Sequence, residues 1–173
     1  MTLKKSMQKG FTVVELLIVI VVIGILAALV LNTFANVQKR ARDTERDTDI
    51  KAISTQLEAC YNGSATSGTL CTGSTGYPST TDMVWGSAST ILKGVDVNAL
   101  TAPNGTIISN ATAASTSDTG TGLVPQPTIG NYVYEPRANA ALCSAAAATC
   151  DNFRLWYMKE DGGIKVKKSL NQP

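Results

Sequence analysis

Three residues, Gly10, Phe11 and Glu15, have types and spacing that allow ion-pair chemistry. Glu15 is the only charged residue in an apolar run from Phe11 to Leu31. A carboxylate inside a membrane costs about 2.5–3.5 kcal/mol and therefore usually has a partner.

Cleavage after Gly10 would free an amine on Phe11 that is mostly protonated near neutral pH. A buried ion pair costs far less than two separate buried charges. Helices stacked with an axial offset would thus pair Glu15 with the Phe11 amine of a neighbour. The alternative is a carboxylate near the lipid headgroups, or bonded to its own N-terminus.

The apolar run must be a helix if it is to place these groups in a membrane. At helical rise, residues 11–31 span roughly 32 Å, about the thickness of a bilayer core. An ordinary secretory signal peptide has an apolar core of only about 7–15 residues and ends at a small-residue site. A simple single-pass anchor agrees with the hydropathy but leaves Gly10 and Glu15 unexplained.

Residues 1–10 form a lysine-containing leader that ends at Gly10, followed by Phe11, then Glu15 as the fifth residue after the glycine. This pattern resembles the class III signal sequence of type IV prepilins and of type II secretion pseudopilins. The resemblance implies that a prepilin peptidase in the membrane removes residues 1–10 by cutting after Gly10. It also implies methylation of the new amine on Phe11.

The helical pattern continues beyond the apolar run. Residues 39–51 are densely charged with alternating sign, which favours a solvated helix face. Apolar residues then recur at helical spacing at Ile50, Ile53 and Leu57, and this stripe is expected to pack on a globular head. Residues 11–61 contain no proline, so a continuous helix is expected. The resemblance divides it into a transmembrane or filament-core half, 11–35, and an amphipathic half, 36–61.

The remaining chain changes composition at residue 62. Residues 62–130 are rich in Gly, Ser and Thr, and predict a variable loop region with short strands or one short helix. Residues 131–173 predict an antiparallel sheet with strands at 132–134, 153–158 and 164–167, the last two joined by a hairpin loop. Alternate residues of the strand 153–158 would pack on the helix. The expected fold is α+β: a long N-terminal helix packed on a small C-terminal antiparallel β-sheet head.

The chain has four cysteines, Cys60, Cys71, Cys143 and Cys150. In an exported chain they indicate two disulfides, for which three connectivities exist. We favour the sequential pairs Cys60–Cys71 and Cys143–Cys150, each of which closes a short loop. In the alternative, Cys60 or Cys71 pairs with a cysteine of the C-terminal pair and ties the helix to the sheet.

Enzyme chemistry has little support in the sequence. The chain contains no histidine, and no nucleotide-binding, GxSxG or HExxH motif is present. The carboxylates of the head lack EF-hand spacing, so no metal or cofactor is expected.

Removal of residues 1–10 takes away three lysines and changes the formal net charge from +2 to −1. Lysines near the C-terminus would allow contact with nucleic acid, but no strongly cationic surface is indicated.

These observations predict a structural protein rather than an enzyme. The resemblance implies a single-pass precursor in the inner (cytoplasmic) membrane that assembly machinery polymerises into an extracellular helical filament of identical subunits. Adhesion, motility and DNA uptake are functions of such filaments, and the sequence does not choose among them. The alternatives are a pseudopilin of a type II secretion system and a membrane-anchored exported binding domain that does not polymerise.

Overall fold

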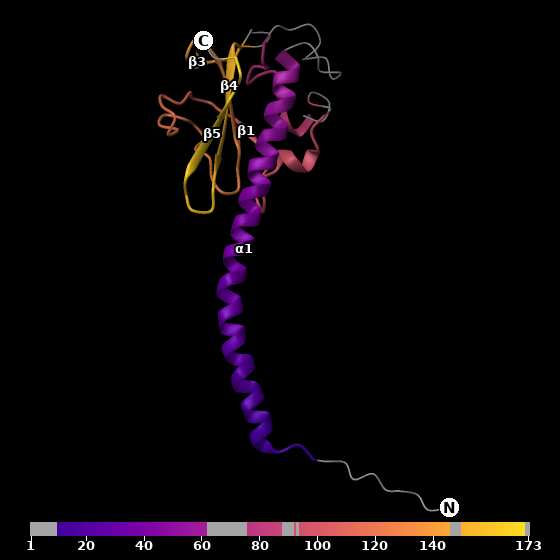
Figure 1. Cartoon of the computed structure of the whole chain (residues 1–173). Helices are drawn as coiled ribbons and strands as arrows, with labels where there is room; N and C mark the ends of the chain where they lie inside the picture. The colour runs from indigo at the N-terminus through magenta and orange to yellow at the C-terminus, as the bar shows by residue number, and fades with distance from the viewer. Residues whose placement is uncertain (1–9, 62–75, 88–91, 93, 146–149, 172–173) are drawn as a thin grey trace, which may run out of the picture. The chain divides into compact units, whose positions relative to one another are not determined.

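The structure is a computed structural model that describes residues 10–61, 76–87, 92, 94–145 and 150–171 (Figure 1). Contacts between Cα atoms divide the chain into two compact units, residues 1–39 and 40–173. We call the second unit the head. The predicted leader, residues 1–10, lies outside the described residues except for Gly10.

One helix, α1 (Val13–Tyr61), contributes residues to both units. Its sequence contains no proline, so no backbone N–H is missing from the helical hydrogen-bond ladder. Its apolar half combines leucine and alanine with valine and isoleucine, whose helix propensities are only slightly lower. Within the head, Ile50, Ile53 and Leu57 are buried. Their spacing of three and four residues places them on one side of the helix, as the sequence predicts.

The head contains a sheet in the order β1-β2-β4-β5, with β3 paired to β2. Its strands are β1 (Ser109–Asn110), β2 (Val133–Ala138), β3 (Ala141–Leu142), β4 (Asn152–Met158) and β5 (Ile164–Lys168). Only the pairing of β1 with β2 is parallel among the described strands. The predicted hairpin of β4 and β5 is confirmed. Its loop includes Gly162 at φ 83°, a conformation that side chains other than glycine rarely adopt.

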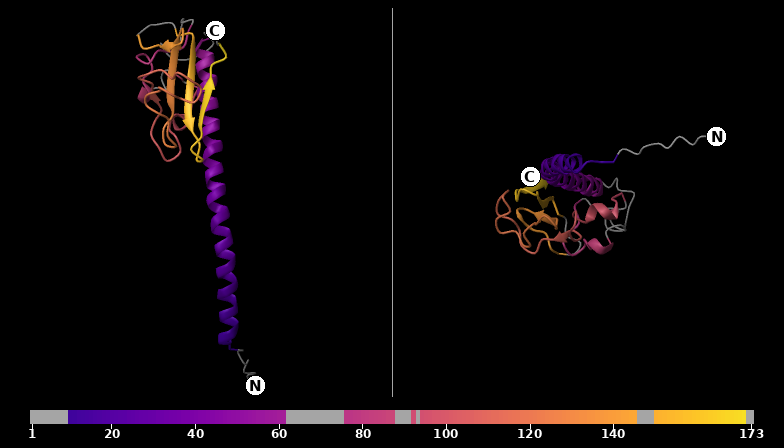
Figure 2. Two further views of the ribbon diagram at one scale, coloured as in Figure 1. Left: turned by 90° about the vertical axis from the view of Figure 1, so that its left-hand side faces the viewer. Right: turned by 90° about the horizontal axis from the view of Figure 1, so that it is seen from below.

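The two faces of the sheet have different covers. On one face, Tyr134, Phe153 and Leu155 pack in a cluster with Ile53 and Leu57 of α1. The opposite face carries a second apolar cluster, which forms around Trp156. Figure 2 shows the sheet beside the part of α1 that belongs to the head. The predicted α+β fold, with a helix packed on one face of a mostly antiparallel sheet, is therefore confirmed.

In the segment between α1 and β2, the described residues include the short 3-10 helices η1 (Trp85–Ser87) and η2 (Val97–Leu100). Apolar side chains of this segment, including Trp85 and Leu100, are buried in the core beside α1. Two loops of the segment touch at Gly105, where an added Cβ would lie 2.1 Å from the carbonyl oxygen of Gly130. Glycine is therefore required at position 105.

The predicted disulfide between Cys143 and Cys150 is present, with an S–S distance of 2.05 Å. It closes the loop between β3 and β4. Cys60 is buried near the end of α1 and is also disulfide-bonded. Cys71 lies outside the described residues, so the pairing of Cys60 with Cys71 stays a prediction.

Candidate assembly site at the start of α1

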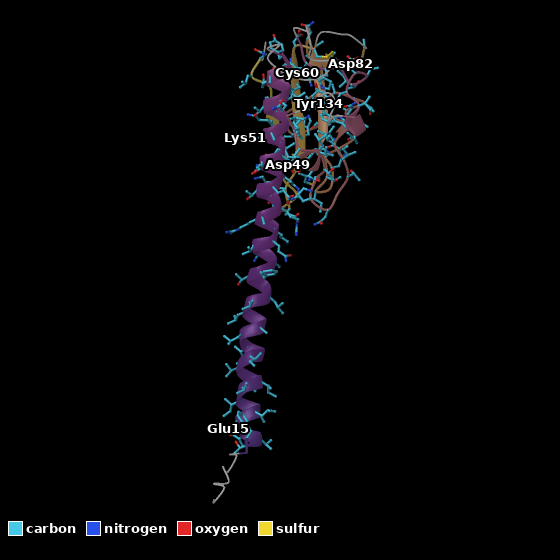
Figure 3. All side chains as sticks on the ribbon, turned by 90° about the vertical axis from the view of Figure 1, so that its right-hand side faces the viewer. Glu15, Asp49, Lys51, Cys60, Asp82 and Tyr134 are labelled. Carbon is cyan, nitrogen blue, oxygen red and sulfur yellow. A yellow bond between two sulfur atoms is a disulfide. The ribbon has the colours of Figure 1, made fainter. Side chains whose placement is uncertain are left out.

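Glu15 lies in the first turn of α1, as Figure 3 shows, and is held there by Thr12. The Thr12 backbone N–H donates to Glu15 Oε2 at 2.9 Å, and the Thr12 hydroxyl donates to the same oxygen at 2.7 Å. In return, the Glu15 N–H donates to the Thr12 hydroxyl oxygen at 3.2 Å. This reciprocal arrangement is a capping box, in which two residues satisfy the free N–H groups at a helix start.

The capping box gives Glu15 a partner within its own chain. The sequence shows the Thr-x-x-Glu signature at Thr12 and Glu15. We favoured the ion pair between chains and gave a bond to the chain's own N-terminus as the alternative, and it is this own-chain bond that the structure contains. Both Thr12 donors reach Oε2, so Oε1 of the exposed carboxylate remains accessible to a cation from another chain. Gly10 and Phe11 precede the helix and are exposed, with Phe11 at 76%. In the uncut chain the nitrogen of Phe11 belongs to a peptide bond and carries no charge.

The helix that follows Glu15 presents apolar side chains in all directions. An 18-residue window of it has a mean hydropathy of 3.2 and is long and apolar enough to cross a membrane, and none of that window is buried. Large apolar side chains from Val13 to Val37 are about half exposed or more. Exposed apolar surface of this extent indicates a lipid or protein partner.

The charged segment of α1 within the head corrects one prediction. We expected residues 39–51 to form a solvated face, but Arg46 is only 1% exposed. Its guanidinium donates to the Ile129 carbonyl at 2.7 Å, to Glu160 at 2.9 Å and to Asp43 at 3.0 Å. Arg42 also pairs with Glu160, at 2.8 Å. The alternation of charges along the sequence could not reveal this network, because Glu160 lies in the β4–β5 loop.

The same contacts set the protonation of the loop carboxylate. Hydrogen bonds from Arg42, together with those from Arg46, lower the pKa of Glu160 to about 2. One turn further along α1, Asp47 accepts from the Tyr157 hydroxyl at 2.7 Å and from Lys159 at 2.9 Å. The β4–β5 hairpin is therefore fastened to α1 by charges that remain ionised near neutral pH.

Asp49 has a different environment on the other side of α1. It accepts a hydrogen bond from the Tyr132 hydroxyl at 2.9 Å. Burial raises the pKa of Asp49 to about 6, and the nearby carboxylates Glu45 and Asp96 act in the same direction. At neutral pH, the ionised form of Asp49 is therefore less stable in the folded chain than it would be in water.

The opposite face of the sheet holds a buried polar cluster around Glu135, which is fully buried. Its carboxylate accepts from the Ser115 N–H at 2.8 Å, from the Trp156 indole at 2.6 Å and from Arg137. These bonds satisfy the buried charge and fasten the loop around Ser115 to the sheet. Sequence reasoning missed the cluster because its members lie far apart along the chain. Among the described residues, no group of three or more His, Cys, Asp or Glu side chains is arranged to hold a metal ion.

Comparisons with known proteins agree with this arrangement. Residues 5–31 match the prokaryotic N-terminal methylation motif. The chain is 39% identical over 55 residues to the type IV major pilin protein PilA of Myxococcus xanthus, covering 32% of this chain and 25% of the relative. It is 39% identical over 56 residues to the type II secretion system core protein G of Pseudomonas aeruginosa, covering 32% and 39% of the two chains.

A third relative matches over a longer stretch. The prepilin peptidase-dependent protein D of Escherichia coli is 34% identical over 88 residues, covering 51% of this chain and 60% of the relative. Each match therefore spans less than two thirds of the relative's length. No solved structure shows significant similarity. The chain thus carries the prokaryotic N-terminal methylation motif and is distantly homologous to type IV pilins and to a type II secretion pseudopilin.

Proposed function

We propose that this protein is a structural subunit of a type IV pilus-like filament. A single-pass membrane precursor is cut after Gly10 by prepilin peptidase, methylated on Phe11 and polymerised through the first half of α1 by inner-membrane machinery. The main support is the exposed apolar surface of this half, which begins with an accessible carboxylate at Glu15. Pilins are structural, non-enzymatic proteins. Among the relatives, the name of a major pilin agrees with polymerisation, and the name of a prepilin peptidase-dependent protein agrees with cleavage.

The capping box suggests how assembly proceeds. Before cleavage, Thr12 supplies the donors for Glu15. After cleavage, Phe11 carries an ammonium group, and Glu15 of an adjacent helix offers the opposite charge through Oε1. Burial of apolar side chains between helices supplies cohesion, at about 25 cal/mol per Å² of surface removed from contact with water. The ion pair supplies register, because any other axial offset leaves both charges buried without partners.

The first test is the intact mass and the N-terminal sequence of the native protein. We expect a chain that begins at methylated Phe11, with four hydrogens missing because two disulfides have formed. A chain that begins at Met1 would favour a plain membrane anchor. One that begins beyond about residue 35 would mean a removed signal peptide, and the filament proposal would fail.

The second test replaces the carboxylate with an amide of the same shape. We expect Glu15→Gln to accumulate in the membrane at the normal level but to yield no filaments in the fraction sheared from cells. Val14→Ile is the control, because it keeps the carboxylate and the apolar surface, and it should yield normal filaments. Abundant filaments from Glu15→Gln would show that the ion pair does not set the register.

A secretion pseudopilin is the second candidate, because core protein G matches at the same identity as the major pilin. The two roles differ in where the assembled protein is found. A pilus subunit appears in long filaments outside the cell, whereas a pseudopilin is needed for secretion of other proteins. Deletion of the gene separates them: loss of surface filaments with normal secretion supports the pilus, and the opposite result supports the pseudopilin. A membrane-anchored binding domain would show neither loss.

A further inference from the structure

The side of α1 that faces away from the sheet is exposed in the part of the head that the structure describes. Its exposed residues have mostly small side chains: Ala41, Thr44, Thr48, Lys51 and Thr55. The three threonine hydroxyls donate to carbonyls of their own helix, at 2.8–2.9 Å. Their hydrogen-bonding groups are thereby turned toward the helix backbone. We call this surface the outer face; it is narrow and bears few groups that need a partner.

One border of the outer face is acidic. It consists of Glu45, Asp49 and Asp96, which lie close enough for Glu45 and Asp96 to affect the titration of Asp49. The close approach of Gly94 to Gln56 of α1 independently places the segment before η2 against this side of the helix. None of the three carboxylates takes part in a salt bridge with the described residues. We call this border the acidic edge.

The other border is basic. It consists of Lys159, Lys165 and Lys167 of the β4–β5 hairpin, and Lys165 lies near enough to Asp47 of α1 to affect its titration. Lys159 pairs with Asp47 at 2.9 Å, but neither Lys165 nor Lys167 forms a salt bridge within the described part of the chain. Both of these lysines are exposed on β5, the last strand in the sheet order. We call this border the basic edge.

The two edges lie on opposite sides of the helix. In Figure 1, β5 lies on one side of the head portion of α1, and the pink segment that includes η2 lies on the other. The view from below in Figure 2 shows the same order. The described residues of the head therefore present opposite charges on the two sides of one exposed helix face.

We propose that a second copy of this chain docks along the outer face, with its acidic edge against the basic edge of the first. This inference rests on the proposed function, and it names the head surface that the filament uses. Because the edges lie on opposite sides, each docked copy leaves one edge free for the next. Such head-to-tail contacts generate open helical assemblies rather than closed dimers. Complementary edges also speed encounter and disfavour other registers.

The test exchanges the charges of the two edges in the full chain and measures filaments sheared from cells. Variant one carries Lys165→Glu and Lys167→Glu; variant two carries Glu45→Lys and Asp96→Asn, because asparagine keeps the cap that Asp96 gives to η2. We expect each variant alone to lose about ten-fold or more of its filament yield, because two acidic edges meet in variant one, and in variant two Lys165 and Lys167 meet an edge that has lost its net negative charge. Co-expression of the two variants, or all four changes in one chain, should restore filaments.

The controls separate this inference from the proposed function. Thr112→Glu adds negative charge at an exposed position just after β1, at the opposite end of the sheet order from β5, and should leave the filament yield unchanged. In cells shifted from ¹⁴N to ¹⁵N medium, the membrane holds copies with either label. Carbodiimide cross-linking of these membranes should yield doubly labelled peptides that join Glu45 or Asp96 of one copy to Lys165 or Lys167 of another. Normal filaments from both variants, without such peptides, would overturn the docking surface and leave the filament proposal standing. Absence of filaments and of these peptides with the unaltered chain would overturn both.

Discussion

Leu31 and Leu57 are the same residue type on the same helix, yet Leu31 is 70% exposed and Leu57 is fully buried. The first half of α1 is apolar on every side, whereas the half within the head confines its large apolar residues to one stripe. The uniform half has no covering partner among the described residues of this chain, and the striped half has a sheet. The distribution of apolar residues around a helix, rather than their number, thus indicates whether its partner lies in the same chain.

The largest loss of stability should come from replacing Arg46, the buried cation in the half of α1 that belongs to the head. Arg46→Ala leaves the Ile129 carbonyl without its guanidinium donor and leaves Glu160 with one arginine instead of two. We expect a loss of about 3–5 kcal/mol in the free energy of unfolding, as is typical when one partner of a buried ion pair is removed. Denaturant titration of the full chain in detergent, followed by fluorescence of the buried Trp85 and Trp156, measures this loss.

Exposed Arg40 serves as the matched control for Arg46. Arg40→Ala should change the unfolding free energy by no more than about 0.5 kcal/mol. Equal effects of the two substitutions would mean that the buried network does not fasten α1 to the hairpin.

The same Leu→Ala substitution, made once in each half of α1, tests whether only the half within the head contributes to the stability of the head. Leu57→Ala should destabilise the head by about 3 kcal/mol, because it removes a fully buried side chain from the core. Leu17→Ala, in the uniform half, should leave the unfolding of the head unchanged within about 0.5 kcal/mol. The same tryptophan signal reports both variants. A large loss with Leu17→Ala would show that the two halves unfold together.

Asp49 provides a pH-dependent test in the head half. Because its folded pKa is about 6 and its ordinary value is 3.8, the folded state binds more protons between these values. Stability from this group therefore falls as pH rises from about 4 to 6. Asp49→Asn should stabilise the head by about 1 kcal/mol at pH 7, discounted for partial exposure. The gain should vanish at pH 4, and a gain that is constant with pH would contradict the raised pKa.

The smallest effect concerns the start of the uniform half. Thr12→Val removes both hydroxyl bonds of the capping box and should destabilise the first turn of α1 by about 1 kcal/mol. Because this turn then opens more often, its amides should exchange roughly five-fold faster. Hydrogen exchange of the amides from Val13 to Leu16 measures it. The control is Thr33→Val, which loses only a hydroxyl bond to the Leu29 carbonyl. Similar exchange in both variants would show that the capping box contributes little.

Local features of this protein could be predicted from the sequence. The absence of proline and the helical spacing of Ile50, Ile53 and Leu57 indicated α1 and its buried side, and alternation indicated the β4–β5 hairpin. Hydropathy and the Gly10, Phe11 and Glu15 pattern indicated the membrane segment and the family resemblance. Each of these signals depends on residues that are neighbours along the chain.

The contacts that join distant segments were decided only by the tertiary structure. Arg46 looks like any charge of a solvated helix until the hairpin brings Glu160 and the loop brings the Ile129 carbonyl to it. Burial of Glu135 likewise depends on Ser115 and Trp156, which other segments supply. A charged side chain can be buried only where several donors or acceptors converge, and that convergence is a property of the folded chain rather than of any one stretch of it.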